Sequence, residues 1–146
     1  MTLRAVLSAC VLALTVALGG CGVSGSVSVE HDKGLREELT TLRDRGESKP
    51  FNEVVPGDWD QAHLVIGPKS GERIREMTDL DVELRGDGTF QGSFTQDGNL
   101  IILTRDGEVV RMISTGQSRV FGEGTVSSSA ILHGNPDSPQ IRVANR

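Results

Sequence analysis

The pattern of hydrophobic and polar residues changes several times along the chain, and each change predicts a different element. An almost wholly apolar run covers residues 5–18. Further on, Leu35, Leu39 and Leu42 recur at helical spacing among charged residues, which predicts an amphipathic helix with a narrow apolar face. Asp32 is placed to cap its start and Gly46 to end it. The alternative for so charged a segment is a solvated stalk that packs against nothing.

From Gln61 onward the pattern favours strands separated by turns. The strands expected are residues 62–66, 80–84, 89–94, 100–104, 109–114, 126–132 and 141–143. Residues 100–103 are apolar on both faces, which is typical of a central strand. Between the first two strands, residues 70–77 predict a short helix with Ile74 and Met77 facing inward.

Asp-Gly pairs at 87–88, 97–98 and 106–107 lie between these apolar runs. Asp-Gly is a strong hairpin signal because both residues accept the positive φ angles of a tight turn. The sequence therefore predicts an α+β fold in which one or two helices pack on a mostly antiparallel β-meander.

The first 21 residues have the layout of an export signal. Arg4 supplies a positive charge, a 14-residue apolar run follows, and Gly19-Gly20-Cys21 closes the segment. A helix that spans a bilayer needs about 20 apolar residues, so a signal peptide is favoured over a membrane span. The cysteine after small residues resembles the lipobox of bacterial lipoproteins. An ordinary secretory signal is the alternative.

The lipobox resemblance implies where the protein is held. It implies that the Cys21 thiol receives a diacylglyceryl group, that the chain is cut before Cys21, and that the new N-terminus is acylated. The expected partner is then the membrane itself, with the protein anchored on the extracytoplasmic face of the cell membrane. We therefore expect a signal peptide at 1–20, a lipidated cysteine and flexible tether at 21–29, and a single α+β domain at 30–146.

Composition excludes several functions of the exported part. The chain has 15 Lys and Arg against 20 Asp and Glu; removing residues 1–20 takes away Arg4 and no acid, which leaves 14 against 20 and a net charge of −6. An acidic chain without a basic cluster predicts no nucleic-acid partner and no basic lipid-binding patch. Cys10 would be removed with the signal and Cys21 lipidated, so no disulfide is expected.

Motifs for catalysis or cofactor binding are absent from the sequence. It holds no G-x-S-x-G or H-E-x-x-H motif, and its three histidines lie far apart. Residues 79–83 start like an EF-hand loop, but Leu84 and Phe90 occupy the positions that require Gly and Glu. We predict no cofactor and no metal site. Carboxylates that converge only in the fold leave a small hydrolase as the alternative.

The segment around Trp59 carries the most distinctive pattern of the exported part. Three residues after Trp59-Asp60 comes an aliphatic run at 64–66, which Gly67-Pro68 ends. Together with the later runs at 99–103 and 106–110, this pattern covers about residues 51–114. This pattern resembles a group of small bacterial exported proteins, in which an aromatic commonly follows the proline; here Lys69 does. The resemblance implies no activity.

Two interpretations of Trp59 follow from its chemistry. The favoured one places the indole as a plug at one end of the core. The other places Asp58, Trp59, Asp60 and Lys69 in an exposed recognition patch, since tryptophan is enriched at binding hot spots.

The function expected from the sequence is that of a lipid-anchored, non-enzymatic binding module. Its partner would be an envelope protein or a cell-wall component. The hydrolase is the second hypothesis, and a lipid carrier, which would need a large apolar cavity, is the third.

Overall fold

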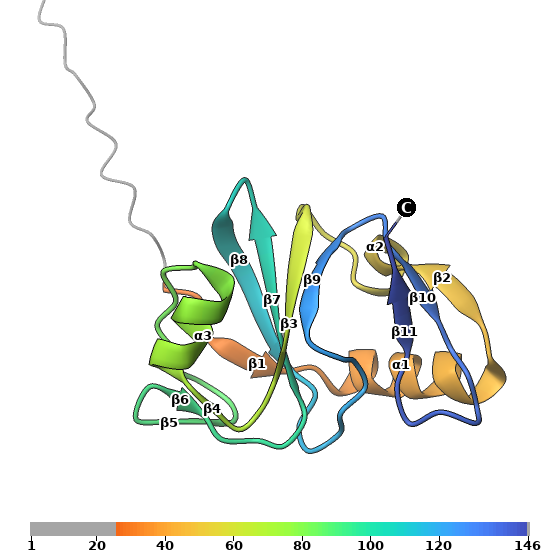
Figure 1. The fold of residues 1–146 in the computed structure, drawn as a ribbon, viewed down its shortest axis with the longest axis horizontal. Helices are drawn as coiled ribbons and strands as arrows, with labels where there is room; N and C mark the ends of the chain where they lie inside the picture. Colours follow the sequence, from red (N-terminus) through yellow and green to blue (C-terminus); the bar gives the residue numbers. More distant parts are fainter. Residues whose placement is uncertain (1–25, 146) are drawn as a thin grey trace, which may run out of the picture.

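A five-stranded sheet forms the centre of the computed structural model, which describes residues 26–145 (Figure 1). The signal peptide, Cys21 and the first residues of the tether lie outside the described residues. The strand order is β1-β8-β7-β3-β9. The strands are β1 (Val29–His31), β3 (Gln61–Ile66), β7 (Asn99–Arg105), β8 (Glu108–Ser114) and β9 (Gly124–Ser127). All neighbours are antiparallel except β1 and β8, which run parallel.

The predicted central strand is confirmed. Six of the seven residues of β7 are buried, because its two faces point into separate apolar clusters on either side of the sheet. The turn from β7 to β8 is also confirmed as a two-residue Asp-Gly hairpin. Asp106 has φ 50° and Gly107 has φ 81°, the left-handed pair that this turn needs. The other two Asp-Gly pairs do not join neighbouring strands of this sheet.

One face of the sheet is covered by two helices and a small second sheet. These are α1 (Lys33–Arg45), α2 (Phe51–Val54) and a three-stranded sheet in the order β11-β10-β2, with β2 (Ser48–Pro50), β10 (Ile131–His133) and β11 (Arg142–Ala144). The run predicted as one strand at 126–132 is divided between β9 and β10. Ser128 and Ser129 turn the chain from one sheet to the other.

The helix predicted from the leucine spacing is confirmed as α1. Leu35, Leu39 and Leu42 are buried against the central sheet. Asp32 accepts the Leu35 N–H at 2.9 Å, and Gly46 ends the helix at φ 63°. The interpretation of this segment as a solvated stalk is wrong, because its apolar face covers the core.

We expect Asp32→Ala to lower the free energy of unfolding by about 1–2 kcal/mol. Asp32 caps α1 and also pairs with Arg111 of β8 at 2.9 Å. The measurement is urea unfolding of the mature chain. Asp44→Ala is the matched control, since exposed Asp44 pairs with neighbouring Arg43, and a change of under about 0.5 kcal/mol is expected. Equal midpoints for the two variants would contradict a stabilising cap.

The opposite face carries α3 (Gly71–Thr78), the irregular segment 79–88, and a small sheet in the order β4-β6-β5. These strands are β4 (Lys69–Ser70), β5 (Thr89–Phe90) and β6 (Ser93–Phe94). The strand predicted at 80–84 is wrong as a strand. Its alternation is nevertheless real: Leu80, Val82 and Leu84 are buried and the residues between them exposed.

Two further details on this face differ from the sequence predictions. Ile74 is fully buried as expected, but Met77 is 38% exposed, so its predicted inward position is wrong. The single strand expected at 89–94 is a hairpin of β5 and β6. Gln91 and Gly92 both have positive φ and turn the chain in the middle of the run.

The start of the domain also differs from the expected boundary at residue 30. Val29 belongs to β1, is buried, and donates its N–H to the Arg85 carbonyl at 2.8 Å. Val27 packs partly against the same cluster. The predicted tether therefore extends too far at its C-terminal end. The α+β class itself is confirmed by three helices and mostly antiparallel sheets within residues 26–145.

Candidate functional site

Trp59 lies in the core, as the favoured interpretation expected. Its side chain is 5% exposed, and its Nε1 donates to the Val55 carbonyl at 2.8 Å. Its ring meets Phe51 edge to face, with 5.2 Å between centroids. A tryptophan held in this way offers no surface to a partner.

The other members of the suggested recognition patch are not brought together. Asp58 pairs with Arg105, and Asp60 accepts the Asp106 N–H at 2.9 Å, so both lie beside the β7–β8 turn. Lys69 follows the opposite end of β3, a six-residue strand of roughly 20 Å. It pairs there with Glu123. The structure therefore does not support a recognition patch made of these four residues.

His63 lies in the core with its ring hydrogen-bonded. It is 8% exposed, and its Nδ1 lies 3.1 Å from the Thr125 hydroxyl. Burial lowers the pKa of His63 below its usual value, because the charged imidazolium is poorly solvated there.

The lowered pKa of His63 predicts that stability falls as the pH drops below about 6.5. In that window the unfolded chain binds a proton that the folded chain binds only at lower pH, so the folded state loses stability on acidification. The slope from one such group is at most about 1.4 kcal/mol per pH unit. His63→Asn should flatten this part of the profile of unfolding free energy against pH. His31→Asn is the control, and an unchanged slope in His63→Asn would contradict the assignment.

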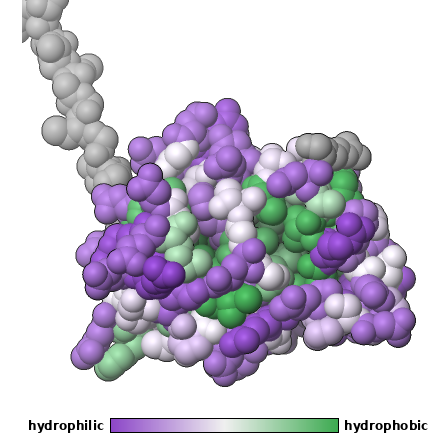
Figure 2. All heavy atoms as spheres, viewed as in Figure 1, coloured by the Kyte–Doolittle hydropathy of each residue, from purple (hydrophilic) through white to green (hydrophobic). Residues whose placement is uncertain are grey.

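The surface is hollowed between β9 and β11, the edge strands of two different sheets. This hollow, which we call the β9–β11 groove, has a volume of about 360 Å³. It is lined by Leu64, Gly122, Glu123, Gly124, Val126, Ser138, Gln140, Ile141, Arg142 and Val143. Figure 2 shows hydrophobic residues gathered on this side of the molecule, where Figure 1 places β9 and β11. The volume lies at the lower end of the range for ligand sites.

The apolar floor of the groove is an opening onto the main core. Leu64 and Ile141 are buried members of the cluster beneath, while Val126 and Val143 are partly buried and pack against it. Val126 comes from β9 and Val143 from β11, so each wall contributes one aliphatic side chain.

A fixed negative charge stands on the β9 side of the groove. Glu123 Oε1 accepts hydrogen bonds from Lys69 Nζ and from the Ile66 N–H. The hydrogen bond from Lys69 lowers the pKa of Glu123 below its usual value, helped by the Ile66 N–H and opposed by partial burial. Glu123 is therefore ionised at neutral pH. Its Oε2 and the Arg142 guanidinium on the facing wall carry no hydrogen bond within residues 26–145.

The backbone of β9 is only partly protected along its outer edge. Ser128 donates its N–H to Asp60, and backbone groups alternate in direction along a strand, so Thr125 and Ser127 face away from β3. Ser127 is protected: its N–H donates to Asn145 Oδ1 at 3.1 Å, and its carbonyl accepts from Ala130. The N–H and carbonyl of Thr125 have no partner within the described residues. Unpaired groups of this kind at a sheet edge are able to pair with another chain.

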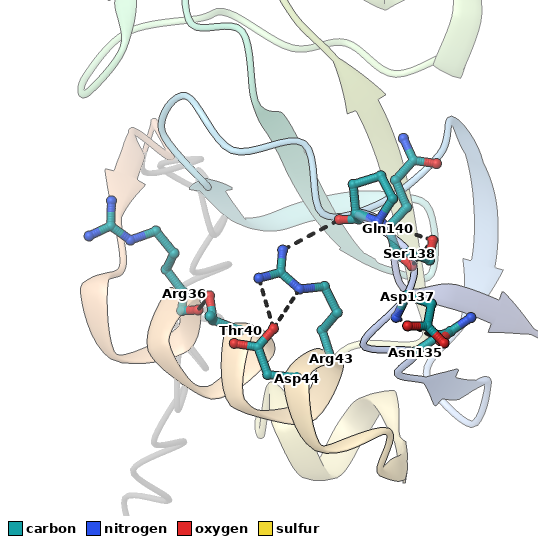
Figure 3. A network of polar contacts seen from close by, with 9 residues as sticks. Arg36, Thr40, Arg43, Asp44, Asn135, Asp137, Ser138 and Gln140 are labelled. Carbon is teal, nitrogen blue, oxygen red and sulfur yellow. Dashed lines mark hydrogen bonds and ion pairs between the residues drawn. The ribbon is translucent and has the colours of Figure 1, made fainter.

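The opposite wall is held by contacts to α1. Figure 3 shows Arg43 reaching from the helix to the Pro139 carbonyl, at 3.5 Å, while also pairing with Asp44. Next to it, Ser138 donates to the Gln140 carbonyl at 3.0 Å. These contacts fix the segment that leads into β11, so the groove has a defined shape before anything binds.

Two other hollows, of about 480 Å³ each, open on the surface of residues 26–145. One, next to Ser26, brings together Asp81, Glu83 and Glu108; Arg85 pairs with Glu83 at 3.3 Å, and Arg75 donates to the Val82 carbonyl.

The other hollow contains a serine–histidine contact, Ser48 Oγ to His133 Nδ1 at 2.8 Å. These residues are direct cross-strand partners in the β2–β10 register, where such a contact is ordinary. Neither side chain has a carboxylate partner within residues 26–145. The pair therefore lacks the third group that activates a nucleophile.

Residues 26–145 contain no group of three or more His, Cys, Asp or Glu side chains placed to hold a metal ion. None of the helices described has the length and hydrophobicity that crossing a membrane would take. No protein-family model, curated protein or solved structure matches the chain.

Sequence reasoning missed the β9–β11 groove. The available signal was the alternation of Ile141 and Val143 in an otherwise polar C-terminal segment, which marks a strand with an apolar face. That this face lies opposite β9, some 15 residues earlier, depends on the assembled fold.

Proposed function

We propose that this protein is a lipid-anchored, non-enzymatic binding module on the extracytoplasmic face of the cell membrane, and that its binding site is the β9–β11 groove. The observation that carries the binding role is an apolar groove lying between two edge strands, with an unpaired carboxylate oxygen and guanidinium on its walls. The anchor rests on the lipobox-like Gly19-Gly20-Cys21 segment. The partner is an envelope protein or a cell-wall component.

A photoreactive side chain placed in the groove of the full-length protein, in living cells, tests this proposal. Position Gln140 is suitable, since it is exposed and lines the groove. The matched control is the same side chain at Thr41, an exposed position on α1. We expect a discrete crosslinked envelope partner from position 140 and none from position 41. Equal crosslinking from both positions, or none from either, would contradict a binding site in the groove.

The hydrolase remains the second candidate, favoured by the three carboxylates that line the hollow next to Ser26. A hydrolytic activity on cell-wall fragments that is lost in Glu108→Gln and retained in Gly122→Leu would favour it over the binding module. Loss of activity in neither variant would remove the support for catalysis at that hollow.

A further inference from the structure

We infer that the β9–β11 groove takes an extended polypeptide segment of a partner protein, which adds as a strand to the edge of β9 and inserts aliphatic side chains into the groove floor. This inference rests on the proposed binding function and specifies the chemical class of its ligand. Three features of the groove support it: a free backbone edge, an apolar floor and opposite charges on the two walls.

The free edge accounts for recognition of a backbone. Thr125, between the lining residues Gly124 and Val126, presents an N–H and a carbonyl at the outer edge of β9, whereas the same groups of Ser127 are already bonded to Asn145 and Ala130. An extended segment beside β9 would supply the missing acceptor and donor. Strand addition of this kind gives affinity through main-chain hydrogen bonds and specificity through alternate side chains.

The apolar floor of the groove determines which side chains of the bound segment fit. Successive side chains of an extended segment point to opposite faces, so every second one would enter the groove. There it would meet Leu64 and Ile141 below, and Val126 and Val143 on the walls. Aliphatic side chains therefore suit these positions, and the intervening side chains stay at the mouth.

The two charged side chains that line the groove account for charge selectivity. Glu123 is ionised and held by Lys69, and Arg142 stands on the facing wall without a partner among the described residues. A segment that carries one basic and one acidic residue at its outward positions complements both.

The size of the groove favours a single segment over a second copy of this chain. A stable dimer buries about 800 Å² on each partner. The groove is a hollow of about 360 Å³, and Asn145 already occupies the N–H of Ser127 on the β9 edge beside it, so the site offers contacts for one short segment and not for an interface of that area.

The test uses the mature chain and the peptide acetyl-Thr-Val-Lys-Val-Glu-Val-amide, in which valines alternate with Lys and Glu. We expect saturable NMR shift changes centred on Thr125 and Val126, and slower hydrogen exchange of the Thr125 amide. Gly122→Leu is the blocking variant: a Cβ at Gly122 meets no atom within 4 Å, so the added side chain occupies the groove without straining the fold. It should weaken binding roughly tenfold or more. Thr41→Leu, which places a leucine at an exposed position on α1, should bind like the wild type.

The other results identify what would be wrong. The same peptide with its backbone N–H groups methylated should not bind, because it cannot donate to a strand ladder in either strand direction. Binding that persists in the methylated peptide or in Gly122→Leu overturns strand addition. Self-association that Gly122→Leu abolishes assigns the groove to a second copy and also overturns it. If the peptide fails while crosslinking from position 140 still captures a partner, the segment class is wrong and the binding module stands.

Discussion

Asn99→Ala is expected to lower the free energy of unfolding by about 3–5 kcal/mol, a large part of the stability of a domain of this size. Asn99 is fully buried at the start of β7, and its amide makes four hydrogen bonds. Oδ1 accepts the N–H groups of Val120 and Phe121 at 2.8 and 2.9 Å. Nδ2 donates to the Val65 and Phe121 carbonyls at 3.3 and 3.1 Å.

The size of this effect follows from what the substitution leaves behind. Alanine would remove all four bonds and leave buried backbone groups without partners, each costing about 1–3 kcal/mol, although such costs do not simply add. The bonds also hold the segment before Gly122 onto β3 and β7, so the groove should lose its shape together with stability.

Urea unfolding of the mature chain measures this loss. Asn52→Ala, at an exposed position in α2, is the matched control, and its change should stay under about 0.5 kcal/mol. Asn99→Asp keeps the two acceptor contacts but loses the donors and buries a charge, so it should also be strongly destabilised. A loss of less than about 1 kcal/mol in Asn99→Ala would mean that water replaces the amide at this site.

The sequence predicted elements whose signals are local. The leucine spacing and caps of α1 and the Asp106-Gly107 turn were found because residues a few positions apart decide them. The doubly apolar run that became β7 was found because a strand buried on both faces needs no partner information to be recognised.

The elements that were missed depend on distant partners. The three-residue strands β1 and β2 exist because other strands supply their hydrogen bonds, and their composition alone does not distinguish them from loops. The segment at 80–84 shows the reverse case. Its alternation predicted which residues are buried, but within the described residues no long neighbouring strand pairs with it, and the chain stays irregular.

The candidate site was less predictable than the fold for the same reason. The sequence drew attention to Trp59 because the residue is rare and its flanking motif distinctive, but a rare aromatic serves the core as readily as a surface. The groove is built from ordinary valines, glycines and one glutamate brought together from β3, β9 and β11. The groove is distinguished by lying between the edge strands of two sheets, and this arrangement is known only once the strands are paired.

Export of the domain without the lipid at Cys21 is expected to move the protein from the membrane fraction to the soluble fraction almost completely, because the proposed lipid anchor is then missing. Each buried CH₂ of an acyl chain contributes about 0.8 kcal/mol to membrane binding, and two or more chains hold a protein stably while one holds it only marginally. The acidic mature chain has no basic cluster to replace this attraction. Cell fractionation followed by quantitative immunoblotting measures the shift.

The variant used must separate loss of the lipid from loss of signal-peptide cleavage. Cys21→Ala also removes the expected cleavage signal, and a precursor that keeps the apolar run 5–18 would stay with the membrane for that reason. Replacing residues 1–21 with a secretory signal cleaved at an A-x-A site avoids this, since it exports the same domain without a lipid or an apolar run. Release of that protein, with the wild type retained and extractable by detergent, is the result that the anchor predicts. A membrane-bound product of mature size, carrying neither lipid nor apolar run, would instead mean that the folded domain itself binds the membrane or a membrane protein.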